Sequence, residues 1–324
     1  MAVYTQLSAE TLAELIAHYD VGELVSAKGI AEGVSNSNWL IETSGSAANG
    51  KRFILTMYER RIELKDLPFF LDLLDHLAAN DCPVPRTIHD RCGDSSRMLD
   101  GKAVALIEFL PGVSVDAPTP AQARNVGGVL ARMHRTAAGF AGERRNSLGP
   151  EVSAQVLADC PVERLAEIDP ALPYVATVAR DVAGQWPEGL PRSIIHSDLF
   201  PDNVLMRGEK VSALIDFYFA CNDAMAYDLA VTHAAWSFSG DGRDYRPEVG
   251  QALVAGYESE RPLTHEERVA MPLLAQGAAL RFVSSRAQDW IETPADALVT
   301  KKDPMDFVRR LEFYRREGKV VFGS

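Results

Sequence analysis

The segment from His196 to Asp216 combines acids and an amide with short apolar runs, a mixture that could support catalysis. It reads HSDLFPDNVLMRGEKVSALID, with Asn203 five residues after Asp198 and Asp216 thirteen residues after Asn203. Burying an unpaired carboxylate is costly, so acids beside apolar runs usually have a partner or a chemical role. Carboxylate and amide oxygens are hard ligands that suit Mg²⁺. Their types and spacing therefore predict that Asn203 and Asp216 hold Mg²⁺.

A short β-hairpin would bring these groups together. The apolar runs on either side of Gly208 can form its two arms, and Asp216 would then emerge at the end of the second arm, near Asn203. Protein kinases have the same layout, in which a loop Asp accepts the proton of the acceptor hydroxyl and a later Asn and Asp hold Mg²⁺. Asp198 would be that base. The alternative, a hydrated acidic hairpin, does not account for the three-part spacing.

The elements that must position this segment fall into two groups, and the first group is rich in strands. A helix is expected from about Ser8, and apolar residues at helical spacing predict another within 66–81. Alternating residues and turn signals predict antiparallel strands at 24–31, 38–43, 52–59 and in a hairpin over 97–110.

The second group is mostly helical and follows a Pro/Gly-rich break over 111–120. Helices are expected at 120–138, 169–186, 226–238, 246–260, 264–290 and 303–317. The pattern predicts an α+β chain with two lobes. We expect a nucleotide-binding lobe over 1–107, a hinge over 108–112, and a catalytic and substrate lobe over 113–324.

Several sequence blocks resemble one known enzyme group. They are AKGIAEGVSNSN (27–38), IHSDLFPDNV (195–204), LIDFYFACNDAMAYDLA (214–230), ALRF (279–282) and TPADALVTKKDPMDF (293–307). Together they are similar to the aminoglycoside phosphotransferase group, which includes choline kinase, and within it most closely to the homoserine kinase family. The resemblance implies a protein-kinase-like two-lobed fold. It also implies ATP and Mg²⁺ as cofactors and L-homoserine as the acceptor whose side-chain hydroxyl is phosphorylated.

The resemblance also assigns nucleotide-binding residues. A polar hairpin would cover the phosphates through side-chain and backbone donors, although an ordinary polar turn is the alternative. Its residues are Gly33, Ser35, Asn36, Ser37 and Asn38. In the hinge, the Glu108 carbonyl and the Leu110 N–H would meet the adenine edge.

One departure from the kinase pattern concerns the phosphate-binding lysine of the third strand, which pairs with a Glu on the next helix. The corresponding positions carry Thr56 and Phe70, so both partners are missing together. Another group must then neutralise the phosphates. Arg52, Arg60 and Arg61 lie nearby in sequence, but each is equally well explained as a solvated surface residue.

An amino-acid acceptor adds its own requirements, since its carboxylate needs a cation and its ammonium needs an acceptor. Asp223 could meet the ammonium, and Arg281 or Arg286 could meet the carboxylate. Salt bridges within the helical lobe are the alternative for each.

Three further residues are expected to have structural rather than chemical roles. His196 would brace the catalytic loop, and by resemblance Asp228 would accept backbone N–H bonds from that loop. His134 is expected to be a packing residue at a helix end.

Composition limits the classes of partner. The formal net charge is −12, and no run of Lys and Arg occurs, which disfavours nucleic-acid binding and anionic membrane surfaces. No window resembles a membrane span, and the four cysteines lack metal-site spacing, which indicates reduced thiols in the cytoplasm. Two rival functions stay open: a kinase for another small alcohol, such as choline or an aminoglycoside, and a nucleotide-binding pseudokinase.

Overall fold

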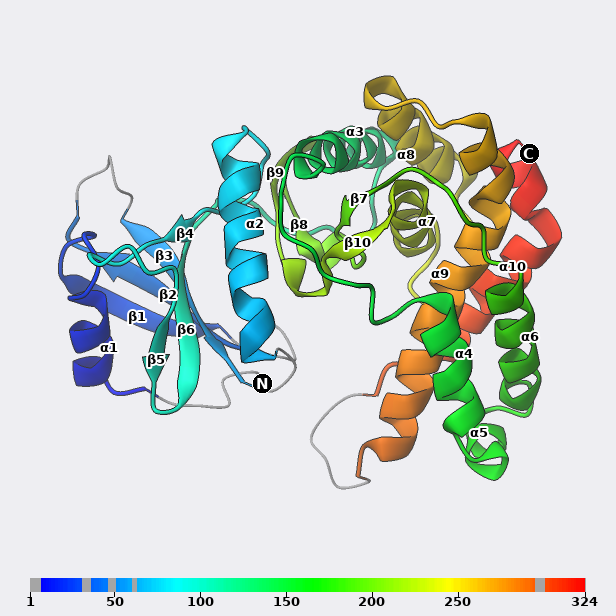
Figure 1. Ribbon diagram of the computed structural model, residues 1–324, viewed down its shortest axis with the longest axis horizontal. Coiled ribbons are helices and arrows are strands. Elements are labelled where there is room, and N and C mark those ends of the chain that lie inside the picture. The colour runs from blue at the N-terminus through cyan, green and yellow to red at the C-terminus, as the bar shows by residue number, and fades with distance from the viewer. Residues whose placement is uncertain (1–6, 31–35, 46–50, 60–62, 295–300, 324) are drawn as a thin grey trace. The chain divides into compact units, whose positions relative to one another are not determined.

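The computed structural model describes residues 7–30, 36–45, 51–59, 63–294 and 301–323. The chain divides into two compact units, one formed by residues 1–112 with 212–218 and the other by 113–211 with 219–324. We call them the sheet unit and the helical unit (Figure 1). The predicted α+β class, with strands first and helices after, is confirmed. The assignment of a separate function to each part of the chain stays a prediction.

The sheet unit is built on one antiparallel sheet, with strand order β1-β2-β3-β6-β4 and β5 paired to β6. Its elements are α1 (Ala9–Ile16), β1 (Leu24–Ile30), β2 (Asn36–Thr43), β3 (Arg52–Tyr58), α2 (Leu67–Ala79), β4 (Thr87–Ile88), β5 (Arg97–Leu99) and β6 (Lys102–Glu108). The predicted strands and the β5–β6 hairpin are confirmed, and Ser8 caps α1 by accepting a hydrogen bond from the Thr11 N–H.

The two faces of this sheet bury different clusters, because side chains alternate along each strand. On one face, Leu55 and Met57 pack with residues of α1. On the other, Tyr58, Ala105 and Ile107 pack with residues of α2. We call these the α1 face and the α2 face, and Figure 1 shows the two helices on opposite sides of the sheet.

The helical unit contains the remaining helices and three short strands. Its elements are α3 (Pro120–Ala137), α4 (Pro150–Asp159), α5 (Val162–Ile168), α6 (Leu172–Gly184), β7 (Arg192–Ile195), β8 (Val204–Arg207), β10 (Cys221–Ala224), α7 (Met225–Trp236), α8 (Pro247–Glu260), α9 (His265–Glu292) and α10 (Met305–Phe322). β7 pairs with β10, and β8 pairs with β9 (Lys210–Leu214), as the predicted hairpin requires. The unit boundary falls within β9.

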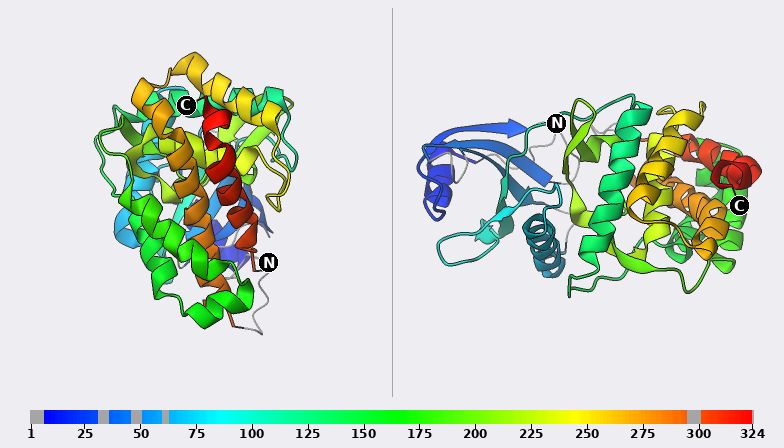
Figure 2. Two further views of the ribbon diagram at one scale, coloured as in Figure 1. Left: turned by 90° about the vertical axis from the view of Figure 1, so that its right-hand side faces the viewer. Right: turned by 90° about the horizontal axis from the view of Figure 1, so that it is seen from above.

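Two glycines allow α3 and α8 to pack closely (Figure 2). A Cβ at Gly127 would lie 2.0 Å from the Leu253 carbonyl oxygen, and one at Gly256 would lie 1.9 Å from the Arg124 carbonyl oxygen. Neither distance is compatible with a side chain, so a larger residue at either position would push the helices apart. The contact between α3 and α8 matters for the candidate site described below, because α3 carries His134 and α8 carries Tyr257.

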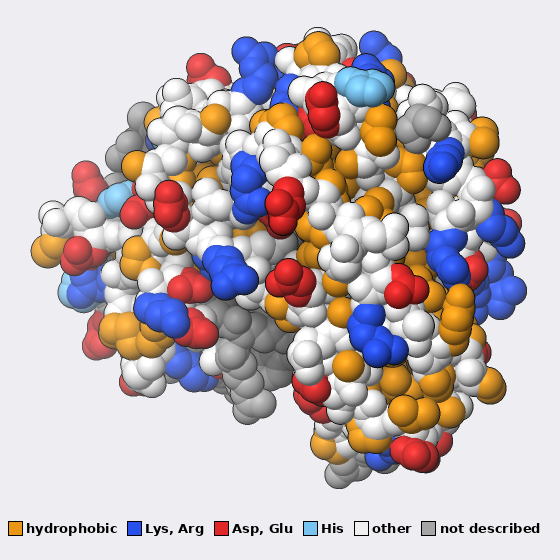
Figure 3. Space-filling model, turned by 45° about the vertical axis from the view of Figure 1, so that its right-hand side comes forward, with side chains coloured by type: hydrophobic (Ala, Val, Ile, Leu, Met, Phe, Trp, Pro, Cys, Tyr) orange, Lys and Arg blue, Asp and Glu red, His pale blue; other side chains and the backbone are white. Residues whose placement is uncertain are grey.

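Three further features of the described residues are their surface charge, the length and hydropathy of their helices, and the state of their cysteines. On the face drawn in Figure 3, basic and acidic side chains are interspersed, and the described residues there form no continuous basic area. No helix within the described ranges is both long enough and apolar enough to span a membrane. All four cysteines are free thiols.

The buried His233 should make stability depend on pH. It is fully buried on α7, its Nδ1 lies 2.7 Å from the Tyr314 hydroxyl, and burial lowers its pKa from 6.5 to about 3. Below about pH 6.5 the unfolded chain binds a proton that the folded chain excludes. We therefore expect the contribution of His233 to the free energy of unfolding to be constant above about pH 6.5. Below pH 6.5, this contribution should fall by up to about 1.4 kcal/mol for each pH unit.

Urea unfolding at about pH 7 and pH 5 measures this loss. His233→Asn should lose less stability between the two pH values than the wild-type chain, whereas His18→Asn, at an exposed position, should match the wild type. Equal losses in all three proteins would contradict the assignment.

Candidate active site

The loop that follows β7 is held by a buried carboxylate. Asp228, in the first turn of α7, accepts the N–H groups of His196 and Ser197, both at 2.7 Å. Ser197 has φ of 67°, a left-handed conformation that a residue other than glycine adopts only when its surroundings hold it there. The two short bonds therefore fix the direction in which the next residue, Asp198, leaves the backbone.

Asp228 is itself kept ionised by its neighbours. Burial raises its pKa, but the hydrogen bond with His134 Nε2, at 2.9 Å, and other favourable contacts outweigh burial and hold the pKa below its usual value. The other ring nitrogen of His134 lies 2.8 Å from the Tyr257 hydroxyl. An ionised carboxylate only accepts, so Nε2 of His134 carries a proton and donates it to Asp228. His134 is thus a buried part of the loop support and more than a packing residue.

Asp198 sits on this loop in a partly enclosed setting. Its side chain is 19% exposed, and its N–H donates to His196 Nδ1 at 3.3 Å. Burial raises the pKa of the Asp198 carboxyl, and the nearby Arg281 guanidinium, with Nη2 3.5 Å from Oδ1, partly offsets this. A carboxylate with a raised pKa, close to a cation and partly open to solvent, is suited to accepting a proton.

Arg281 contacts the loop that carries Asp198 at two points. It is 3% exposed, its Nη1 donates to Ser197 Oγ at 3.0 Å, and its guanidinium lies over the rings of Phe219 and Phe282. The sequence predicts that Arg281 or Arg286 binds the substrate carboxylate. Here Arg281 already compensates the charge of Asp198, so its first role is to position the loop.

Asn203 closes the loop in a short 3-10 turn. Its Nδ2 donates to the Asp198 carbonyl oxygen at 2.8 Å and lies 3.4 Å from Oδ2 of the same residue. The NH₂ group is therefore committed to the loop, and the amide oxygen is the atom suited to a metal. Asn203 belongs to the helical unit and Asp216 to the sheet unit, so their joint coordination of Mg²⁺ stays a prediction.

Asp216 follows β9 and adopts φ of 66°, again a left-handed conformation in a residue other than glycine. It lies close enough to Tyr58 and Tyr218 to help raise both of their pKa values, although burial is the larger cause. The two tyrosine hydroxyls are 3.2 Å apart, and both residues belong to the cluster on the α2 face. Asp216 is therefore placed at the α2 face of the sheet.

No cluster of three His, Cys, Asp or Glu that could hold a metal by itself occurs among the residues that the structure describes. This is compatible with the predicted chemistry, because Mg²⁺ is usually held by one or two protein groups together with substrate phosphates.

The predicted nucleotide residues on β2 lie on both faces of the sheet. Asn38 Oδ1 accepts a hydrogen bond from Thr56 Oγ1 at 2.9 Å, whereas Ser37 Oγ donates to Glu59 at 2.7 Å on the α1 side. Asn36 is 5% exposed, and its side-chain oxygen has no partner within the described part of the chain. A buried amide oxygen without a partner among the described residues fits a site that a polar ligand completes.

The remaining predicted nucleotide residues are Gly33, Ser35, Glu108 and Leu110. Gly33 and Ser35 lie outside the described residues. Glu108 ends β6, and its side chain accepts from the backbone N–H of Arg86 at 3.2 Å. The predicted contacts with adenine use the backbone carbonyl of Glu108 and the backbone N–H of Leu110. The bond made by the Glu108 side chain does not affect them, and they stay a prediction.

Two predicted substrate residues already have charged partners in the helical unit. Arg286 lies 2.8 Å from Asp306, and Asp223 lies 3.4 Å from Arg192 and accepts from Asn146 at 2.6 Å. Their charges are compensated within the chain, as the alternative interpretation expected. We therefore leave both out of the substrate site proposed below.

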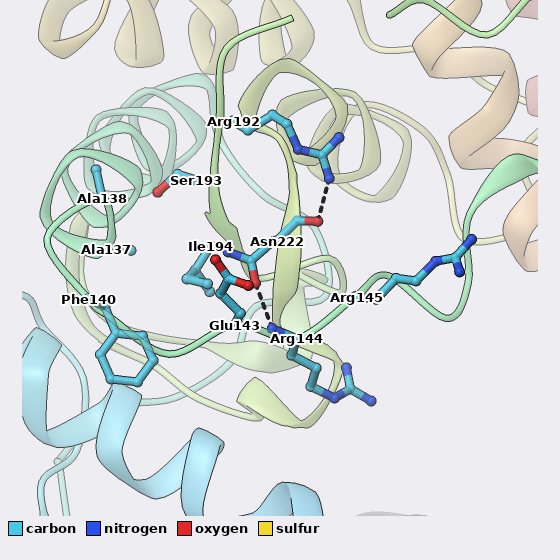
Figure 4. Close-up of a pocket in the computed structure, with 10 residues that line it drawn as sticks. All are labelled: Ala137, Ala138, Phe140, Glu143, Arg144, Arg145, Arg192, Ser193, Ile194 and Asn222. Carbon is cyan, nitrogen blue, oxygen red and sulfur yellow. Dashed lines mark hydrogen bonds between the residues drawn. The ribbon is translucent and has the colours of Figure 1, made fainter. Parts of the chain in front are cut away.

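A separate hollow of about 490 Å³ occurs beside the C-terminal end of α3 (Figure 4). It is lined by Ala137, Ala138, Phe140, Glu143, Arg144, Arg145, Arg192, Ser193, Ile194 and Asn222. None of the predicted site residues lines it. Asn222 is tied there to the Arg144 N–H at 2.6 Å and to Arg192 through its own carbonyl at 2.8 Å, so we assign it a structural role.

Comparisons with solved structures give the fold. Amicoumacin kinase superposes with a TM-score of 0.69 and 14% identity, covering 98% of this chain and 94% of that one. The choline kinase of Cryptosporidium parvum gives a TM-score of 0.65 and 12% identity, covering 98% and 97%. The predicted protein-kinase-like fold, with an antiparallel sheet followed by helices, is thereby confirmed.

Comparisons of sequence give the family. Residues 26–266 match the model of the phosphotransferase enzyme family. A curated homoserine kinase from a Caulobacter species is 47% identical and covers 100% of this chain and 99% of that protein. The one from Granulibacter bethesdensis is 46% identical and covers 97% of each. The chain belongs to the phosphotransferase enzyme family and, within it, to the group that contains these homoserine kinases.

Proposed function

We propose that the chain transfers the γ-phosphate of ATP to the side-chain hydroxyl of L-homoserine, giving O-phospho-L-homoserine and ADP. The observation that carries this proposal is the identity of 44–47% to curated homoserine kinases over essentially the whole chain. The use of ATP is supported by the amicoumacin kinase structure, which was solved with AMP-PNP. In the homoserine kinase group this reaction leads toward threonine, and four free thiols suit a reducing compartment such as the cytoplasm.

Asp198 supplies the base in this proposal. Its carboxylate accepts the hydroxyl proton as the acceptor oxygen forms a bond to the γ-phosphorus and the bond to the ADP oxygen breaks. Asp228 fixes the backbone before it, and Arg281 keeps a positive charge 3.5 Å from its Oδ1. The Asn203 amide oxygen and the Asp216 carboxylate would hold Mg²⁺, which would supply positive charge to the β- and γ-phosphates.

The acceptor's own charges need partners near Asp198. Besides Arg281 and His196, the groups that shift the pKa of Asp198 include Asp202, which raises it, and Lys302, which lowers it. Both belong to the helical unit and both are exposed. An exposed cation and an exposed anion beside the base match the carboxylate and ammonium of an amino acid. We therefore assign the carboxylate to Lys302 and the ammonium to Asp202.

Two rival functions predict different chemistry. A kinase for choline or a polycationic aminoglycoside should present acidic or aromatic groups to its acceptor rather than a cation. A pseudokinase should bind nucleotide without turnover. The absence of a lysine at position 56, which is Thr56, favours a pseudokinase. The hydrogen bonds that hold the Asp198 loop in place argue against one.

A panel of acceptors tests the proposal by coupled ADP release. L-homoserine should be phosphorylated, whereas homoserinol, which lacks the carboxylate, should be slower by up to roughly 10⁴, because a site built to bind a polar group rejects analogues without it. D-homoserine, L-serine, choline and kanamycin complete the panel. Turnover of choline or kanamycin without turnover of L-homoserine would refute the proposed acceptor. Absence of turnover with every acceptor would favour the pseudokinase.

Two lysine variants make the panel sharper. Lys302→Met should raise the KM for L-homoserine and leave the low activity on homoserinol unchanged, because only L-homoserine has a carboxylate that Lys302 can bind. Lys319→Met removes the same charge from an exposed position near the end of α10 and should behave like the wild type. Equal behaviour of the two variants would remove Lys302 from the substrate site.

A further inference from the structure

The α2 face of the sheet lacks the cation that protein kinases place on the third strand. Thr56 occupies that position, is 4% exposed, and uses its hydroxyl to bond Asn38. The helix position that would carry the paired Glu is Phe70, which is 1% exposed and lies against Tyr218. A triphosphate held at this face needs a positive charge from another element.

The strand register shows which side chains share the face of Thr56, because residues directly opposite one another point the same way. One row across the sheet contains Ile30, Asn38, Thr56 and Ala105. The next row toward the end of β6 contains Lys28, Leu40, Ile54 and Ile107. Lys28 therefore points to the α2 face, one row from Thr56.

The distance between the two positions suits a shared phosphate group. Lys28 is on β1 and Thr56 on β3, two strand spacings and one row apart, so their Cα atoms are roughly 12 Å from each other. A lysine carries its charge on a flexible four-carbon stem. The Lys28 ammonium can thus reach the space over β2 on the α2 face. A lysine at position 56 would reach the same space from β3, on the opposite side of β2.

Other basic residues on the described strands are less suitable. Lys102 lies on the α1 side, because it is two residues before the buried Val104 on β6, and it pairs with Glu59. Arg97 pairs with Asp90. Arg52 is two rows from Thr56 and stacks on Phe109, with its guanidinium carbon 4.9 Å from the ring centroid. Arg60 and Arg61, named in the sequence analysis, lie outside the described residues.

The part of the α2 face around Lys28 is open enough for a ligand. Lys28 is exposed, and its row neighbours Leu40 and Ile54 are only partly buried, whereas Ala105 and Ile107 are covered by the cluster with α2. The amide oxygen of Asn36, which has no hydrogen-bond partner among the described residues, belongs to a residue that lies opposite Tyr58 on the same face. Apolar surface for a base, an amide oxygen and a cation thus occur on the same face of the sheet, the face at which Asp216 also lies.

We propose that Lys28 on β1 supplies the phosphate-binding charge that Thr56 cannot, so that the nucleotide is held from the first strand instead of the third. This inference rests on the proposed ATP-dependent function but does not depend on which alcohol accepts the phosphate. It also removes the main argument for a pseudokinase, because the missing lysine would then be a relocated one.

Nucleotide binding without any acceptor provides the first test. Isothermal titration should show that Lys28→Met weakens the binding of the Mg²⁺ complex of AMP-PNP about tenfold or more and leaves the binding of adenosine within twofold, since adenosine has no phosphates. Lys51→Met, which removes an exposed charge just before β3, should bind both ligands like the wild type. Urea unfolding midpoints confirm that the variants are folded.

Turnover provides the second test. Lys28→Met should lower kcat/KM for ATP by about 10²-fold, with the KM for L-homoserine little changed, and Lys28→Arg should recover part of the loss because it keeps the charge. Unchanged AMP-PNP binding and turnover in Lys28→Met, or an equal loss of adenosine binding, would overturn the proposal. A wild-type chain that ignores L-homoserine while Lys28→Met still loses AMP-PNP binding would refute the proposed acceptor and support this inference.

Discussion

Asp198→Asn is expected to abolish most turnover while leaving the fold and ATP binding intact. Removal of a positioned general base typically costs about 10²–10⁴ in rate. The amide keeps the size of the side chain and can still face Arg281 and Asn203, but it cannot accept the hydroxyl proton. Initial rates with L-homoserine, together with a calorimetric titration of AMP-PNP, measure the two expectations separately.

The pH profile gives an independent readout of the same group. Burial raises the pKa of the Asp198 carboxyl, and a base works only when ionised. The wild-type kcat/KM should therefore fall as the pH drops through this raised pKa, and Asp198→Asn should lose that acid limb along with its rate. Glu209→Gln, at the exposed turn of the β8–β9 hairpin, should keep both rate and profile. Wild-type turnover in Asp198→Asn would place the base elsewhere.

Local sequence patterns predicted most of the fold, because most elements follow a clear period. The hairpin around Gly208, the β5–β6 hairpin and the helix α9 all match their expected ranges within a few residues. The missed elements are α4, α5, β4, β7 and β10. The strands among them have two to four residues, too short for a periodic signal, and they exist because a partner strand elsewhere in the chain pairs with them.

The candidate site was predictable where its residues are neighbours in sequence. Asp198 and Asn203 lie on one loop, so their residue types and spacing, together with the apolar runs that follow, were enough to predict a role for each, and those roles stay predictions. The support of that loop was not predictable, because His134 and Tyr257 come from different helices that meet only through the close packing of α3 and α8. A histidine on the buried face of α3 was the available signal, and it also fits ordinary packing.

The two arginines of α9 show why type and spacing are insufficient for a substrate site. Arg281 and Arg286 looked equivalent in the sequence. Arg286 contacts Asp306 on α10, whereas Arg281 contacts Ser197 and Asp198. A charged group with a partner inside the chain has less free energy to gain from a ligand. The relevant property is therefore the neighbourhood of each side chain, which depends on the packing of helices distant in sequence.

Asp216→Asn is expected to remove most Mg²⁺-dependent activity. The carboxylate contributes a negative charge to a divalent cation, and loss of one preorganised electrostatic group at a phosphoryl-transfer site costs about 10²–10³ in rate. Asn is the informative replacement because Asp216 has φ of 66°, and Asn tolerates this left-handed conformation better than Ala does. Asp216→Ala adds roughly 1–2 kcal/mol of backbone strain, so it tests stability and metal binding at once.

A titration with Mg²⁺ at fixed ATP and L-homoserine separates the possible causes. If Asp216 is a ligand, the midpoint for activation moves to higher Mg²⁺ in Asp216→Asn, and the urea unfolding midpoint stays near that of the wild type. Lys28→Met serves as the contrast, since a lysine that binds phosphate should weaken ATP binding while the remaining activity still needs Asp216. A wild-type Mg²⁺ requirement and rate in Asp216→Asn would show that the metal is held by other groups, and the carboxylate would then serve only to shape the turn that follows β9.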